Sequence, residues 1–318
     1  MNILTYLLGA PIARGPYSSI ASWMTRLPQC PFSGEVERAI WGGYHTDRLG
    51  YAFAAGYAAA LRRLLDHAAS TQGLARPFPD PPLSGHACLC ATESGGAHPR
   101  AIQTKLDKQG GALVVSGEKT YATLATLADE LLVVASRGSE QGGKNRLRVV
   151  RVSPGAEGVT ITEREPPPFA PEIPHAIVKL DGVVVESSHV LPGDGYDVYL
   201  KPFRTIEDVH VLAATVGFSM GAARAHGFGR DVETELVSLA LSLVDVGARD
   251  PSSPLTHVIL AGLFGSARRL LASLDGAWTA RAPEEERLRW ERDRALLLVA
   301  EQARGRRLEA AYASISSS

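Results

Sequence analysis

The spacing of apolar residues changes along this chain from helical to strand-like and back, and this limits its possible folds most strongly. Apolar side chains recur at helical spacing within residues 47–67, short β-prone runs replace them from about residue 86 to residue 191, and helical spacing then returns. This order predicts an α+β multidomain fold with a helical N-terminal region, a middle β-barrel domain and a C-terminal helical bundle.

Proline and glycine clusters mark the expected domain boundaries. Four prolines between Pro77 and Pro82, followed by Gly85, interrupt regular structure because proline lacks a backbone donor and restricts the preceding residue. A second cluster, residues 192–195, precedes the last helical region. We therefore predict domains at residues 1–84, 85–195 and 196–318.

Individual elements follow from the same patterns. Thr46 is expected to cap a helix over 47–67. The expected strands are Ala87–Ala91, Ala112–Ser116, Glu130–Ser136, Arg146–Val152, Val159–Thr162, Ile177–Leu180 and Val183–Val185. The expected C-terminal helices are Phe203–His226, Val232–Val246, Leu255–Leu274 and one long helix over Pro283–Tyr312.

Composition excludes several classes of function. The 318 residues carry a formal net charge of -1, which provides no global field to attract nucleic acid or an anionic membrane. Apolar runs are too short to span a bilayer, and the first residues lack the pattern of a secretory signal, so we expect a cytoplasmic protein.

The three cysteines, Cys30, Cys88 and Cys90, lack the spacing of a zinc site or a disulfide framework, and Cys88 and Cys90 are expected to be small core residues. No metal site is predicted. The absence of a G-x-G-x-x-G segment opening a βαβ unit disfavours a nicotinamide cofactor.

Three segments of the middle region stand in an order that is typical of one family. They are residues 91–99 (ATESGGAHP), 117–123 (GEKTYAT) and 128–135 (ADELLVVA). Together they resemble the acyl-CoA dehydrogenase family, with the similarity strongest over residues 85–225, and the chain is expected to be a short, divergent member. The resemblance implies FAD bound between the β-domain and the C-terminal helices.

The resemblance also implies roles for individual residues. Tyr121 would stand beside the flavin where relatives carry Trp, Thr123 would place a hydroxyl near flavin N5, and Ala97 would contact cofactor and substrate. Arg204 would contact substrate. The remaining expected cofactor contacts lie in one run beside the isoalloxazine and ribityl groups: Leu89, Cys90, Ala91 and Thr92.

Glu207 is the candidate catalytic base. The usual late Tyr-Glu-Gly-like segment is absent, but residues 203–217 resemble the helix on which a minority of relatives carry the base, which places Glu207 at that position. An apolar stripe beside it (Val211, Ala214 and Phe218) would raise the pKa of its carboxyl. Alternatively, a helix that begins at Thr205 would make Glu207 a first-turn acid with a lowered pKa.

Two departures from the family pattern complicate the assignment. Asp208 stands where relatives usually carry Arg, and Arg204 is expected to pair with it; the segment at 94–98 also lacks the usual Ser-Asp. Arg268 and Arg269 are candidates to hold the FAD pyrophosphate in place of absent segments.

The leading expectation is a flavin-dependent oxidoreductase of lipid metabolism that removes hydrogens α,β to an acyl-CoA thioester. It would pass electrons to an electron-transfer flavoprotein or another acceptor, and would form a homodimer or larger homo-oligomer. The alternatives are a flavin monooxygenase and a non-catalytic homologue that binds acyl-CoA or partners a catalytic paralogue.

Overall fold

The computed structural model describes residues 2–75, 78–79, 85–139 and 143–317. Within these ranges the chain divides into two compact units, and the division falls within helices α4 (Leu49–Thr71) and α5 (Lys201–His226). Unit 1 contains residues 1–62, 167–172 and 204–318, and unit 2 contains residues 63–166 and 173–203. The N-terminal and C-terminal helical regions thus pack as one unit. The proline cluster that predicts the first boundary lies mostly outside the described residues.

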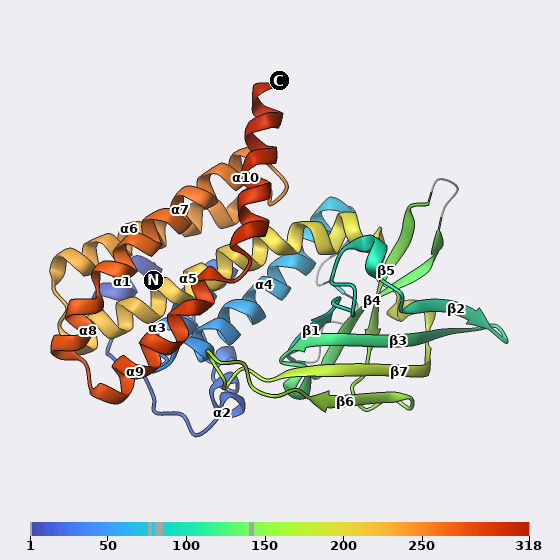
Figure 1. Ribbon diagram of the computed structural model, residues 1–318, viewed down its shortest axis with the longest axis horizontal. Helices are drawn as coiled ribbons and strands as arrows, with labels where there is room; N and C mark the ends of the chain where they lie inside the picture. The colour runs from blue at the N-terminus through green and yellow to red at the C-terminus, as the bar shows by residue number, and fades with distance from the viewer. Residues whose placement is uncertain (1, 76–77, 80–84, 140–142, 318) are drawn as a thin grey trace. The chain divides into compact units, whose positions relative to one another are not determined.

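Unit 1 is helical. Alongside parts of α4 and α5 it holds α1 (Ile3–Gly9), α2 (Ile20–Met24), α3 (Glu35–Tyr44), α6 (Arg230–Ala248), α7 (Pro254–Ser273), α8 (Asp275–Arg281), α9 (Glu284–Asp293), the 3₁₀ segment η6 (Arg294–Leu298) and α10 (Glu301–Ser316). Helices α6 and α7 pack side by side, and α10 packs against α7 (Figure 1). None of the helices in the described ranges is both long and apolar enough to cross a bilayer.

Glycines allow α3 and α5 to approach closely. A Cβ built on Gly217 would lie 2.1 Å from the carbonyl oxygen of Ile40, and one on Gly221 would lie 2.5 Å from that of Tyr44. Both distances are far inside van der Waals contact, so only glycine fits at these positions. This close packing fixes α5, which carries Glu207, against α3.

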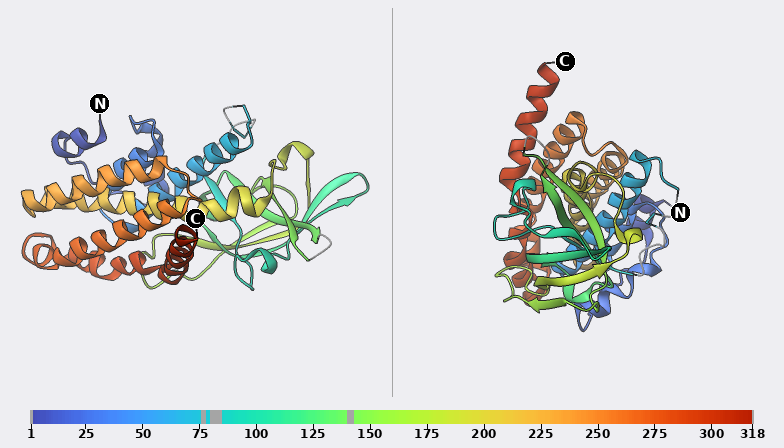
Figure 2. Two further views of the ribbon diagram at one scale, coloured as in Figure 1. Left: turned by 90° about the horizontal axis from the view of Figure 1, so that it is seen from above. Right: turned by 90° about the vertical axis from the view of Figure 1, so that its right-hand side faces the viewer.

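Unit 2 is built on one seven-stranded sheet with the order β1-β4-β2-β3-β7-β6, and β5 pairs with β4. Its strands are β1 (Ala87–Cys90), β2 (Lys105–Gln109), β3 (Ala112–Thr123), β4 (Glu130–Ser139), β5 (Asn145–Val152), β6 (Val159–Glu163) and β7 (His175–Val185). The sheet curls around one apolar cluster that includes Cys88, Val133 and Val178, and its curvature is seen end-on in Figure 2. The expected α+β architecture, with helical ends and a middle β-domain, is confirmed.

Several element predictions need correction. The expected helix over Pro283–Tyr312 is divided into α9, η6 and α10, and Ala300, with φ of 63°, separates η6 from α10 by its left-handed conformation. The stretch expected to form two strands after residue 176 is the single strand β7. Strand β2 was not predicted, because its alternating pattern is weak: only Leu106 of its five residues is buried.

Candidate functional site

Strands β1 and β3 bring the expected cofactor residues of unit 2 together. A single antiparallel bridge joins Thr92, just after β1, to Tyr121 in β3, and the backbone N–H of Thr120 donates to the carbonyl oxygen of Thr92 at 2.9 Å. Segments that lie about 30 residues apart in the sequence are therefore neighbours in unit 2.

The alternation of β1 separates its side chains onto two faces. Cys88 and Cys90 are fully buried in the apolar cluster of unit 2, which confirms that they are core residues. Leu89 and Ala91 therefore point to the opposite face. Because the thiol of Cys90 is enclosed by the core, Cys90 could contact a cofactor only through its backbone.

A β-bulge in β3 places Tyr121 on the outer face. The register between β3 and β7 shifts between Lys119 and Ala122, so that Lys119 and Ala122 both point inward while Tyr121 is 42% exposed. Thr123, two residues further along β3, is partly buried. The outer face of unit 2 thus presents a flat aromatic ring close to a hydroxyl.

Two residues that the sequence did not single out support Tyr121. The ring of His175 stacks on it with centroids 4.3 Å apart, and the guanidinium of Arg164 lies 5.6 Å from its centroid. His175 Nδ1 is also 3.2 Å from Thr123 Oγ1. Burial, and secondarily the charge of Arg164, lowers the pKa of His175 to about 4, so its imidazole is neutral near pH 7.

Glu93 and Lys119, one from each of the first two motifs, form a buried ion pair. Lys119 Nζ donates to Glu93 Oε1 and to the Val134 carbonyl oxygen, each at 2.6 Å. Glu93 also accepts from the backbone of Gln103 and from the backbone and hydroxyl of Thr104. Burial would raise the pKa of Glu93, but its bonds to Lys119 and Thr104 lower it overall. This pair ties the turn after β1 to β3 and β4.

That turn contains Ala97, the other expected contact. Glu93 and Gly96 exchange backbone hydrogen bonds of 3.1 and 2.8 Å, and Gly96 has φ of 93°. Ala97 follows as a partly buried residue, and the exposed His98 caps the short 3₁₀ helix Pro99–Ala101 through its Nδ1. The role of Ala97 toward a ligand stays a prediction.

In unit 1, Glu207 lies in the second turn of α5. This helix begins at Lys201, after a π-helical turn (Gly195–Leu200) that the side chain of Asp194 caps. The alternative in which Glu207 is a first-turn acid at a helix start is therefore wrong. Burial, followed by the charge of Asp208, raises the pKa of Glu207 to about 7, with Arg204 and Arg307 opposing the rise.

Asp208 is held by arginines that the sequence did not connect with it. Arg304 Nη1 donates to Asp208 Oδ1 at 3.0 Å, and Arg307 Nη2 donates to Asp208 Oδ2. Both arginines belong to α10, about 100 residues further along the chain. The expected partner, Arg204, is exposed and only acts on Glu207 through its charge.

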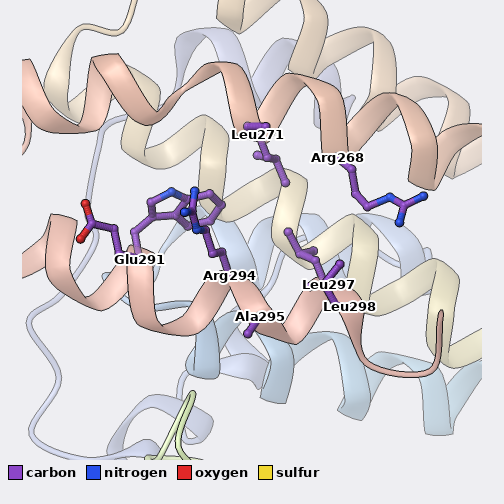
Figure 3. Close-up of a pocket in the computed structure, with 9 residues that line it drawn as sticks. Arg268, Leu271, Glu291, Arg294, Ala295, Leu297 and Leu298 are labelled. Atoms are coloured by element: carbon purple, nitrogen blue, oxygen red, sulfur yellow. The ribbon is translucent and has the colours of Figure 1, made fainter.

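A cavity of about 310 Å³ lies elsewhere in unit 1, between α7, α9 and η6. Leu271 points across it toward Leu297 and Leu298, while Arg268 extends away along α7 (Figure 3). Arg268 is already paired with Glu301, at the start of α10. The lining is mainly apolar, and no predicted site residue belongs to it.

Comparison with known proteins agrees with this architecture. Residues 88–183 match the family described as acyl-CoA dehydrogenase, middle domain. Benzylmalonyl-CoA dehydrogenase of Aromatoleum aromaticum is 30% identical over 141 residues, which cover 43% of this chain and 35% of that protein. The match thus spans about a third of this curated relative.

Solved structures extend the similarity of fold beyond the middle domain. Butyryl-CoA dehydrogenase from Megasphaera elsdenii has a TM-score of 0.68 at 15% identity, covering 92% of this chain and 89% of that one. An acyl-CoA dehydrogenase from Geobacillus kaustophilus has a TM-score of 0.66 at 14% identity, covering 94% and 90%. These two structures show the same fold as this chain, with helical segments before and after a curled sheet in the sequence. Residues 88–183 match the middle domain of the acyl-CoA dehydrogenase family.

The residues of unit 2 fit the flavin that the family implies. The 42% exposed Tyr121 supplies an aromatic surface that the neutral His175 ring supports by stacking, and the guanidinium of Arg164 lies over the same Tyr121 ring. Thr123 supplies a hydroxyl that can donate or accept, depending on the proton of His175 Nδ1.

Proposed function

We propose that this protein is a flavin-dependent acyl-CoA dehydrogenase-like oxidoreductase that removes hydrogens α,β to an acyl thioester. The observation that carries the proposal is that one chain has both the family's middle-domain motifs and, on α5, a carboxyl of raised pKa at the alternative base position. FAD, when bound, would accept the hydride from the β-carbon of the substrate.

Glu207 is proposed as the base that takes the α-proton. A carboxyl with a pKa of about 7 is ionised in half of the molecules at neutral pH and is a stronger base than an ordinary glutamate. Its environment also favours the product of that step, the neutral acid, because burial disfavours the charged form.

Unit 2 is proposed to bind the cofactor ring. Tyr121 would pack against its face, Thr123 would hydrogen-bond to its edge, and the backbone from Leu89 to Thr92 would approach it. Ala97 and Arg204 are proposed to contact substrate, and an electron-transfer flavoprotein or another acceptor would reoxidise the enzyme.

The first test is flavin binding. We expect purified protein to show visible flavin absorbance, either as isolated or after FAD is added and excess is removed. Protein that does not retain FAD under either condition would contradict the proposal and favour a non-catalytic homologue that acts in complex with a paralogue.

The second test is Glu207→Gln. We expect this variant to retain FAD but to lose flavin bleaching by a panel of acyl-CoA thioesters, with a rate reduced about 10²–10⁴-fold. Glu235→Gln, an exposed acid on α6, is the matched control and should bleach at the wild-type rate. Unchanged bleaching in Glu207→Gln would remove Glu207 from the mechanism.

A further inference from the structure

The α10 arginines contact α5 on both sides of Glu207. Arg307 donates through Nη1 to Thr205 Oγ1 at 3.1 Å and through Nη2 to Asp208, so it spans the residues that flank Glu207. Arg304 donates to Asp208 and, through Nη2, to the carbonyl oxygen of Leu297 at 3.0 Å. Glu207 therefore lies on a stretch of α5 that α10 holds at two points.

These arginines are fixed by further contacts. The guanidinium of Arg304 lies 4.1 Å from the ring centroid of Phe264 in α7. Thr205, which Arg307 contacts, is buried, and its hydroxyl is 3.3 Å from His257 Nε2, which is itself 2.9 Å from the carbonyl oxygen of Pro251. Both arginines have little freedom to turn away from α5.

The same arginines have no room to act as an anion-binding site for a ligand. The cavity that Arg304, Arg307 and His257 line has a volume of about 10 Å³. That is at the lower limit for a single water molecule. The carboxylate that both arginines contact is that of Asp208.

We propose that Arg304 and Arg307 are positioning residues for Glu207: they hold Asp208 in place and oppose its negative charge beside Glu207. This inference rests on the proposed function of Glu207. The charged groups that act on Glu207 are Asp208 and Arg204 on α5 and Arg307 on α10, while Arg304 is paired with Asp208.

Asp208 and Arg307 change the pKa of Glu207 in opposite directions. Asp208 raises the pKa of Glu207, whereas Arg307 lowers it. Removing Arg307 should therefore raise the pKa of Glu207 further, and removing the charge of Asp208 should lower it. The opposite signs follow from the opposite charges of the two side chains.

The experiment measures the pKa of Glu207 in flavin-free protein. The free energy of unfolding is measured against pH for each background with and without Glu207→Gln, and the difference between the two curves reports the titration of Glu207 alone. We expect Arg307→Ala to raise its pKa by about 1 unit and Asp208→Asn to lower it by about 1 unit. Arg307→Lys, which keeps the charge, should lie close to wild type.

Arg306→Ala is the matched control, because Arg306 is an exposed neighbour on the same helix; it should leave the pKa unchanged. If Arg307→Ala does not fold, Arg307→Gln removes the same charge with a smaller change in side-chain volume and takes its place. Shifts of the same sign, or no shift, in the two variants would overturn it.

The rate of flavin bleaching, measured as a function of pH, distinguishes a failure of this inference from a failure of the proposed function. If both are right, the acidic limb of the profile moves with the pKa measured in flavin-free protein. If the pKa moves but the profile does not, the positioning stands and Glu207 is not the base.

Discussion

Glu93 in unit 2 is buried and Glu207 in unit 1 is partly buried, and their carboxyls are in opposite surroundings. Glu93 accepts hydrogen bonds from Lys119, Thr104 and Gln103, and these bonds lower its pKa despite burial. Glu207 has no hydrogen-bond partner among the described residues, and its pKa rises to about 7. The difference teaches that burial alone does not make a base; a carboxyl must also lack donors that stabilise its charge.

The largest expected effect comes from Lys119→Met. It would leave the Glu93 carboxylate buried without its cation, which is expected to lower the free energy of unfolding by about 3–5 kcal/mol. Urea denaturation at neutral pH measures this. The double variant Glu93→Gln with Lys119→Met should recover much of the loss, and a loss below 1 kcal/mol in the single variant would mean that the pair is not a structural anchor.

Glu207→Gln is expected to change the free energy of unfolding by a comparable amount, and this change should depend on pH. Because its pKa is raised in the folded state, its neutral form is stabilising below the unfolded pKa of about 4.3, and this stability is lost as the pH rises toward 7. Wild type should therefore lose about 3 kcal/mol relative to Glu207→Gln between pH 4 and pH 8. Chemical denaturation across that range checks it; a difference that does not vary with pH would show that Glu207 titrates normally.

The smallest expected effect is that of Thr104→Val, which removes one hydroxyl donor from Glu93 while keeping Lys119. A hydrogen bond to a charged group contributes about 1.5–3 kcal/mol, so the loss should be smaller than that of Lys119→Met. Urea denaturation ranks the two variants directly. If Thr104→Val were the more damaging, the hydroxyl and not the lysine would be the main support of Glu93.

The sequence predicted most of the elements but not how all of them end. Short β-prone runs located β1 and β4, and helical spacing located α5, α6 and α7. The break at Ala300 was not visible, because a left-handed alanine carries no local signal comparable to glycine or proline. Short helices such as α1 and α2 have too few residues to show a period.

Some residues of the candidate site were predicted from the sequence, and others were found only in the structure. Tyr121 and Thr123 were placed by their motif, and the structure brings Tyr121 next to Thr92. His175 and Arg164 were missed because stacking partners from other strands and loops leave no pattern around Tyr121 itself. Arg304 and Arg307, spaced three apart on a helix, were a weak signal that gains meaning only once Asp208 is known to face them.

The sequence by itself determined the order of helical and β regions, the family motifs and the position of Glu207 on a helix, because these depend on local spacing. Tertiary structure alone decided which charges surround each carboxyl: Lys119 beside Glu93, and the α10 arginines beside Asp208. Electrostatic interactions depend on distance in space, and residues about 100 positions apart are brought together only by helix packing.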